Sequence, residues 1–181
     1  MLDAEKAWKL LREAELVCPE NEVRAAVERL AKEITAALGD TVPLVLGVMG
    51  GGVVFTGQLL PRLRFPLEFD YIHVTRYAGD TRGGTIQWKV EPRTSVAGRT
   101  VLVLDDVLDE GHTLAAVRSR LVAQGAAGVY LAVFAEKMLS KPKPVAAEFV
   151  GVRLPDKYVF GFGMDVNDAW RNLPAVYAVK G

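Results

Sequence analysis

The sequence contains a single cysteine, Cys18, only two histidines, and no excess of charge of either sign. One cysteine excludes an internal disulfide and fits a reducing compartment. With one cysteine and two histidines, a zinc site of the usual Cys/His kind is also excluded. Lys plus Arg and Asp plus Glu number 22 each, so the formal net charge is zero. This balance argues against a protein that coats nucleic acid or an anionic membrane.

Long apolar runs are also missing, since none approaches the roughly 20 residues that span a bilayer. Residues 1–6 lack the basic segment and apolar core of a signal peptide, so we expect a cytoplasmic protein. The composition is that of a globular protein, with 50% hydrophobic and 24% charged residues. A chain of 181 residues fits one domain, 1–181, with a core large enough to carry a cleft.

Apolar periodicity predicts that helices and strands alternate along the chain. Apolar residues recur every three or four positions within 21–38, which indicates an amphipathic helix, and 3–17 is also predicted to be helical. The remaining predicted helices are 53–63 and 113–124, and the predicted strands are 42–48, 67–74, 85–90, 100–104, 129–135, 148–152 and 158–162. This alternation predicts an α/β fold with a mostly parallel sheet flanked by helices.

In such a sheet, ligands bind at the carboxyl ends of the strands, where we expect two loops, 49–52 and 105–113. The second loop contains four acids: Asp105, Asp106, Asp109 and Glu110. Adjacent strand residues point to opposite faces, so Asp105 and Asp106 are not both expected to be solvated. Crowding raises carboxylate pKa values unless cations or hydroxyl donors offset it. A magnesium ion would supply the cation, and a polyhydroxylated sugar would supply the hydroxyl donors.

The end of this segment has the chemistry of an anion site. Gly111 permits close approach of the backbone, and Thr113 stands at a predicted helix N-terminus, where free N–H groups suit a phosphate. Acids for a sugar and a metal, beside amides for a phosphate, describe a ribose-5-phosphate site. The alternative is a solvated acidic turn in which Thr113 caps the helix.

The segment 104–113 resembles the phosphoribosyl-pyrophosphate (PRPP) signature of the type I phosphoribosyltransferases. That signature consists of apolar residues, two acids, two apolar residues, an acid, a small or polar residue, glycine, any residue and threonine. The glycine loop 49–52, Lys137, and the segment 155–165 followed by Arg171 are similar to the bacterial hypoxanthine-guanine branch. The resemblance implies the type I phosphoribosyltransferase fold with a small hood. It also implies Mg²⁺-dependent purine salvage, in which hypoxanthine or guanine displaces pyrophosphate from PRPP to give IMP or GMP.

The resemblance assigns roles on the PRPP side of the reaction. Asp105 and Asp106 would hold the ribose hydroxyls and Mg²⁺, and Asp109 would accept a proton from N7 of the purine. The 5′-phosphate would bind, mostly through backbone N–H groups, to Glu110, Gly111, His112 and Thr113. Pyrophosphate would contact Gly50, Gly51 and Arg171.

On the purine side, the resemblance implies that Lys137 donates to the oxygen at C6, which selects 6-oxopurines over adenine. Tyr158 would stack on the purine, the Val159 backbone would contact the base edge, and Asp165 would bind a second Mg²⁺ beside it. Taken alone, a residue like Lys137 is usually a solvated lysine, one like Tyr158 a core aromatic, and one like Arg171 a partner in a surface salt bridge.

Further expectations concern motion, assembly and rival functions. The glycine-containing stretch 77–84 is predicted to be a lid that excludes water from the reaction. The family implies a homo-oligomer, a dimer or a tetramer. A xanthine-preferring relative, and a PRPP-binding regulator of the same fold that binds nucleic acid, remain alternative functions. The zero net charge counts against the regulator.

Overall fold

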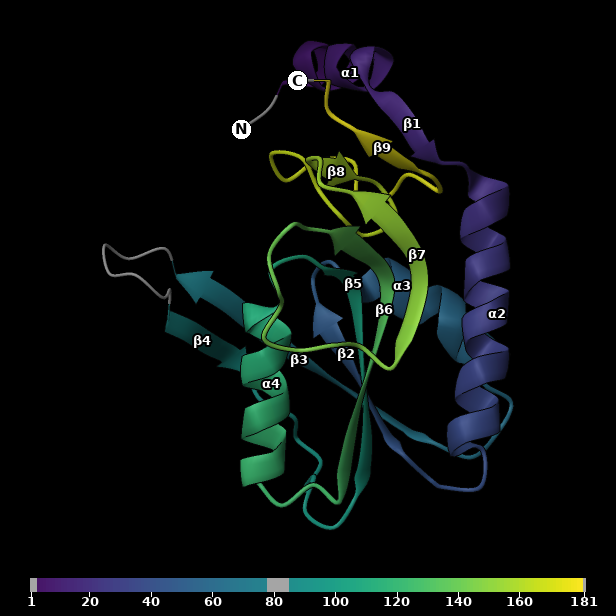
Figure 1. The fold of residues 1–181 in the computed structure, drawn as a ribbon, viewed down its shortest axis with the longest axis vertical. Helices are drawn as coiled ribbons and strands as arrows, with labels where there is room; N and C mark the ends of the chain where they lie inside the picture. The colour runs from purple at the N-terminus through teal and green to yellow at the C-terminus, as the bar shows by residue number, and fades with distance from the viewer. Residues whose placement is uncertain (1–2, 78–84, 181) are drawn as a thin grey trace.

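The computed structural model describes residues 3–77 and 85–180, and its main body is a six-stranded sheet in the order β4-β3-β2-β5-β6-β7 (Figure 1). The strands are β2 (Leu44–Met49), β3 (Glu68–Tyr77), β4 (Thr85–Val90), β5 (Thr100–Leu108), β6 (Gly128–Met138) and β7 (Phe149–Pro155). Every neighbouring pair is parallel except β3 with β4. The predicted α/β fold with a mostly parallel sheet is confirmed.

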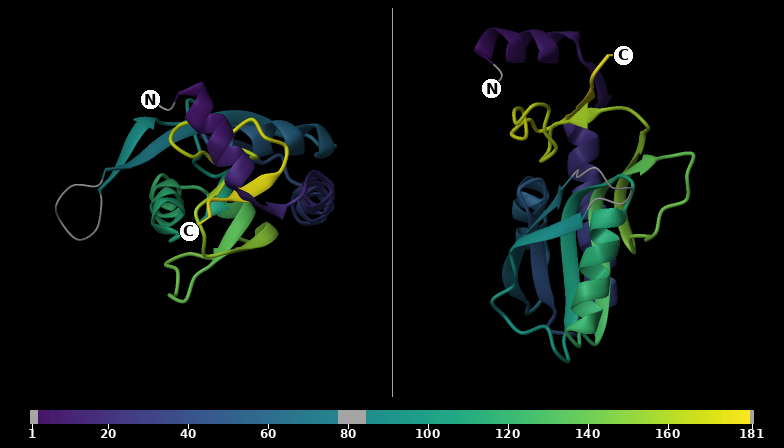
Figure 2. Two further views of the ribbon diagram at one scale, coloured as in Figure 1. Left: turned by 90° about the horizontal axis from the view of Figure 1, so that it is seen from above. Right: turned by 90° about the vertical axis from the view of Figure 1, so that its left-hand side faces the viewer.

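Helices cover both faces of this sheet, as the view from above shows (Figure 2). Helices α2 (Glu20–Leu38) and α3 (Val53–Leu59) pack on one face, and α3 continues into a short 3-10 helix, Leu60–Arg62. Helix α4 (His112–Ala123) packs on the other face. None of the helices in the described part of the chain is long and apolar enough to cross a bilayer.

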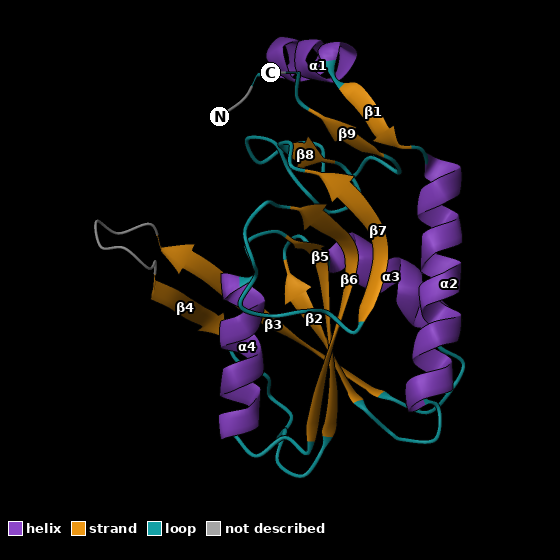
Figure 3. Ribbon diagram, viewed as in Figure 1, coloured by secondary structure: helices purple, strands orange, loops and turns teal. Residues whose placement is uncertain are grey.

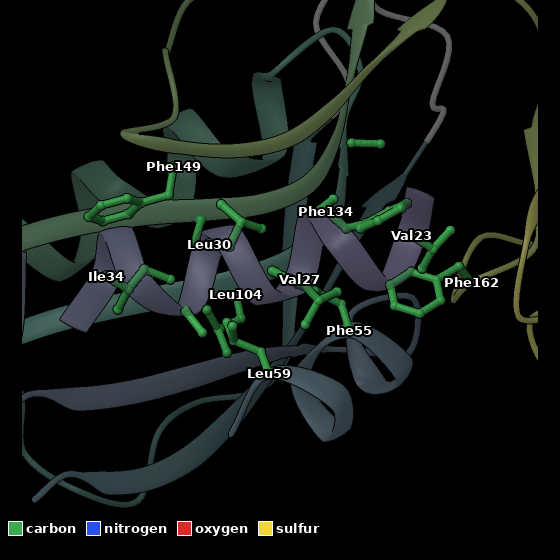
Figure 4. Packing of buried hydrophobic residues seen from close by; sticks show 14 of the residues in the cluster. Val23, Val27, Leu30, Ile34, Phe55, Leu59, Leu104, Phe134, Phe149 and Phe162 are labelled. Carbon is green, nitrogen blue, oxygen red and sulfur yellow. The ribbon is translucent and has the colours of Figure 1, made fainter. Parts of the chain in front are cut away.

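The apolar stripe predicted for 21–38 lies on α2 and is completely buried (Figure 4). It packs against alternate residues of β5, Leu102 and Leu104, whereas Val101 and Val103 face α4. Because successive side chains of a strand point to opposite faces, β5 contributes buried residues to both faces of the parallel sheet. Burial of each large side chain stabilises the fold by roughly 1.5–3 kcal/mol.

Above the carboxyl edge of the main sheet stands a small antiparallel sheet, the hood predicted from the resemblance (Figure 3). Its strands, in the order β1-β9-β8, are β1 (Glu15–Cys18), β9 (Val176–Ala178) and β8 (Val159–Phe160). Helix α1 (Ala4–Glu13) attaches to the hood through Trp8 and Trp170, whose ring centroids are 5.0 Å apart. The indole N–H of Trp170 also donates to the carbonyl of Ala7 at 3.1 Å.

Two sequence predictions of secondary structure are wrong. The helix predicted for 3–17 ends at Glu13, because Ala14 is extended and the chain then pairs with β9 near the other end of the sequence. In this pairing Glu15 lies opposite Ala178. The strand predicted for 100–104 runs on to Leu108, because its end pairs with β6. Asp105 and Asp106 are therefore strand residues and not loop residues. The lid predicted for 77–84 lies outside the described residues, except for Tyr77 at the end of β3.

Candidate functional site

A cleft of about 460 Å³ opens at the carboxyl ends of β2 and β5. Its walls come from the glycine turn after β2, the end of β3, the acidic end of β5, the start of α4, and one arginine of the hood. All the residues predicted for PRPP and pyrophosphate line this cleft: Gly50, Gly51, Asp105, Asp106, Glu110, Gly111, His112, Thr113 and Arg171. Asp109 lines it as well.

A second hollow, of about 170 Å³, adjoins the first. All the residues predicted for the purine line it: Lys137, Tyr158, Val159 and Asp165. The two hollows share Asp106, Val107 and Asp109 as lining residues. The fold thus brings the two predicted groups of residues to either side of one wall, and Asp109 belongs to that wall.

Asp105 and Asp106 are both buried, with 9% and 8% of their surfaces exposed. Burial, followed by the neighbouring charge of Asp106, raises the pKa of Asp105 well above its usual value. Burial also raises the pKa of Asp106, although bonds to Asp105 and the Val107 N–H, and the charge of Arg171, act in the opposite direction. The expectation that these acids are crowded and not freely solvated is confirmed.

The glycine turn after β2 approaches the acids closely. A Cβ atom added to Gly51 would lie 2.0 Å from a carboxylate oxygen of Asp106, so a side chain at this position would displace the acid. On the other side of this turn, a Cβ atom added to Gly163 would lie 2.2 Å from the carbonyl oxygen of Gly51. The Met49–Gly50 peptide bond is cis. At Gly51 and Gly163, the glycine turn, the acidic strand and the hood approach one another too closely to admit a side chain.

Helix α4 begins beside the cleft with Gly111 as its N-cap residue, in the left-handed conformation at φ +84°. No side chain in the described part of the chain caps this helix, so the alternative in which Thr113 is the cap is wrong. The first N–H groups of a helix have no partner within the helix and carry its positive dipole end. The start of α4 can therefore bind an anion in the cleft, as a phosphate group requires.

Two ion pairs connect the walls of the hollows. The Nζ atom of Lys137, on β6, donates to a carboxylate oxygen of Asp109 at 2.8 Å, and only 13% of the Lys137 side chain is exposed. Arg171 pairs with Asp165 at 2.5 Å and donates to the carbonyl of Gly163 at 2.7 Å. Lys137 is thus not a solvated lysine, and the Arg171–Asp165 pair belongs to the site.

Tyr158 is 56% exposed at the rim of the second hollow. The alternative in which it is a core aromatic is therefore wrong. Its neighbour Val159 is 6% exposed and belongs to β8 and to the core. This arrangement leaves an aromatic face at the surface and a rigid strand backbone beside it.

Sequence reasoning missed part of the lining. His73 and Thr75, from the end of β3, line the larger cleft, and Met164 of the hood lines the smaller one. A signal for the first two was available, because β3 is parallel to β2 and its carboxyl end must lie at the same edge. No comparable signal points to Met164, whose place depends on the turns of the hood.

The sequence and the fold have clear relatives. Residues 19–169 match the model of the phosphoribosyl transferase domain family. The hypoxanthine-guanine phosphoribosyltransferase of Bacillus subtilis (strain 168) is 31% identical over 162 residues, which cover 89% of this chain and 90% of that protein.

Two solved structures share the fold. A hypoxanthine phosphoribosyltransferase from Staphylococcus aureus superposes with a TM-score of 0.88 at 23% identity, over 95% of each chain, a likeness that shows the fold alone. A hypoxanthine-guanine-xanthine phosphoribosyltransferase superposes with a TM-score of 0.85 at 26% identity, over 94% of this chain and 99% of that one.

Proposed function

Because the chain belongs to the phosphoribosyl transferase domain family, we propose that its two hollows carry out purine salvage. The reaction transfers the 5-phosphoribosyl group from PRPP to hypoxanthine or guanine and gives IMP or GMP and pyrophosphate. One observation carries this proposal: the acids and amides suited to PRPP line one hollow, the groups suited to a purine line the next, and Asp109 lies in both.

The larger hollow suits PRPP because its walls match the three parts of that molecule. The first turn of α4 offers amides to the 5′-phosphate, and the carboxylates of Asp105 and Asp106 accept hydrogen bonds from the ribose hydroxyls. The bare backbone of Gly50 and Gly51, together with Arg171, faces the pyrophosphate. Holding both substrates in one orientation removes much of the entropic part of the barrier.

The purine in the smaller hollow lies next to the proton acceptor. N9 attacks C1 of the ribose as pyrophosphate leaves, and the purine then has a proton to lose from N7. Asp109 takes that proton as a general base, while Lys137 donates to the oxygen at C6. Tyr158 stacks on the ring and the Val159 backbone contacts its edge. As C1 develops positive charge, the carboxylates around it stabilise the transition state electrostatically.

The donor set also fits Mg²⁺. Asp105 and Asp106 supply the carboxylate oxygens that this ion prefers. However, the described residues contain no group of three or more His, Cys, Asp or Glu side chains placed to hold a metal ion. These donors fit an ion that enters with PRPP, with Asp105 and Asp106 on one side and Asp165 near a second ion. When bound, Mg²⁺ neutralises the charge of the leaving pyrophosphate.

We further propose that residues 1–181 act as one phosphoribosyltransferase domain, since hood and main sheet line the same hollows. We also propose that the protein acts in the cytoplasm and that the chain forms a homo-oligomer, a dimer or a tetramer. Light scattering after size-exclusion chromatography would test the oligomeric state.

The test of the function is a turnover assay with PRPP and Mg²⁺ on a panel of bases: hypoxanthine, guanine, xanthine and adenine. We expect IMP and GMP, little turnover of adenine, and loss of activity in excess chelator that returns with Mg²⁺. Binding of PRPP without turnover of any base would overturn the proposal in favour of a regulator. Preference for xanthine would establish the other alternative.

A further inference from the structure

Lys143 is a loop lysine with an unusually enclosed ammonium group. It lies between β6 and β7, and only 10% of its side chain is exposed. Its Nζ atom donates to the carbonyl of Lys137 at 2.6 Å and to the carbonyl of Leu108 at 3.0 Å. Glu136 lies 3.3 Å away and balances the charge. Lysines are seldom buried unless they are paired, so this position calls for an explanation.

One of the two carbonyls belongs to the purine-binding lysine, and the other to the residue just before the proton acceptor. One is the carbonyl of Lys137 itself, at the end of β6. The other is that of Leu108, the last residue of β5, whose carbon forms the peptide bond to Asp109. The β5–β6 pairing ends nearby, at Leu108 opposite Glu136. Beyond that point, Lys143 ties together the two strand ends from which the Asp109 and Lys137 side chains project.

The same loop also contacts the phosphate side of the site. A Cβ atom at Gly111 would lie 3.3 Å from Val145 and 3.4 Å from Pro144. The two residues after Lys143 thus pack on the turn that begins α4, whose residues line the cleft. One short loop therefore supports the phosphate turn, the proton acceptor and the purine-binding lysine together.

We propose that Lys143 is a positioning residue, which sets the distance and orientation of Asp109 relative to Lys137 by bonding to the backbone of both strand ends. This inference rests on the proposed function. Lys143 lines neither hollow of the site, so it acts through Asp109 and Lys137 and not on the substrates. An apolar side chain would fill the same space without joining the two carbonyls.

The test compares Lys143→Met with Lys143→Arg, and uses Lys141→Met as the matched control. Lys141 is exposed on the same loop. Misplacement of reacting groups by a fraction of an ångström to 1 Å lowers rates by up to roughly a hundredfold. We therefore expect kcat to fall about tenfold to a hundredfold in Lys143→Met, with a smaller change in the KM for PRPP. Lys143→Arg, which keeps the cation and its donors, should recover part of kcat, and Lys141→Met should match the wild type.

A double-mutant cycle separates positioning from a general structural role. If Lys143 acts through Asp109, Lys143→Met should have little further effect on kcat in an Asp109→Asn background, because coupled residues are not additive. Full additivity of the two losses would overturn the proposal, as would wild-type kcat in Lys143→Met. If Lys143→Met does not fold, Lys143→Gln carries the same cycle. Absence of turnover in the wild-type chain would instead defeat the proposed function.

Discussion

The ammonium group of Lys137 donates a 2.8 Å hydrogen bond to a carboxylate oxygen of Asp109, between the ends of two neighbouring strands. The two residues are 28 positions apart in the sequence. An ammonium group has three donors, so one bond to Asp109 leaves others for the oxygen of a 6-oxopurine. In the proposed reaction, the pair would therefore join recognition of the base to acceptance of its proton.

Replacing Asp109 by asparagine tests the acceptance of the proton. An amide keeps the size of the carboxylate and can still accept the bond from Lys137, but it does not act as a base. General base catalysis contributes roughly 10²–10⁴-fold, so kcat should fall within that range. The KM for PRPP should change little, because the proposed binding site of the 5′-phosphate is the backbone amides of α4. Steady-state kinetics and a melting curve measure both quantities.

The matched control for this variant is Asp40→Asn, at an exposed acid that lines neither hollow of the site. It should retain wild-type kinetics. An Asp109→Asn enzyme that melts at a lower temperature but turns over at the wild-type rate would show that Asp109 has only a structural role.

Replacing Lys137 by alanine tests the selection of the base. The loss of a charged donor should lower kcat/KM for hypoxanthine by about tenfold to a hundredfold, whereas adenine, which has a donor at C6, should lose much less. The ratio of kcat/KM for hypoxanthine to that for adenine is the decisive measurement. A variant that keeps the wild-type ratio would exclude Lys137 from recognition of C6.

Replacing Asp105 by asparagine should separate stability from function. Burial and the charge of Asp106 raise the pKa of Asp105, so its ionised form destabilises the fold. A neutral amide should therefore raise the unfolding free energy of the substrate-free protein by roughly 0.5–2 kcal/mol. Activity should fall, because in the proposed site the ribose and Mg²⁺ would lose a ligand. Melting curves without PRPP and Mg²⁺, beside turnover assays, measure the two effects; a lower melting temperature would contradict the argument.

Asp70 should make stability depend on pH on the acid side. Burial acts to raise its pKa, but hydrogen bonds from the N–H groups of Tyr71, Thr94 and Arg93 outweigh it and hold the pKa below its usual value. A carboxyl group with a lowered native pKa stabilises the fold above its unfolded pKa, about 3.9, and this contribution is lost as the pH falls through the native pKa.

Asp70→Asn should therefore lose about 1–3 kcal/mol of unfolding free energy near neutral pH, since a buried acceptor is weakened. The difference from the wild type should shrink below about pH 4. Urea denaturation at a series of pH values measures it, with Asp40→Asn as the exposed control. A difference that stays constant from pH 7 to pH 3 would exclude the ionised carboxylate as its source.

Several features were predictable because they depend on residues close together in the sequence. The stripe on α2 follows from a spacing of three or four residues, and the alternation on β5 from a spacing of two. The order of acids, glycine and threonine in 104–113 likewise lies in one short segment, and its place between a strand and a helix sets it at the carboxyl edge. Local spacing thus predicted a mostly parallel sheet covered by helices, and one wall of the site.

Other features depended on contacts that local spacing does not encode. The extension of β5 to Leu108 results from pairing with β6, and β1 is a strand only because β9 lies beside it. The bond from Lys137 to Asp109, and those from Lys143 to both strand ends, join residues of separate segments. The sequence by itself determined which residues could bind a sugar phosphate and a purine. Only the tertiary structure decided their distances, because hydrogen bonds and packing require groups to meet within a few ångströms wherever they lie along the chain.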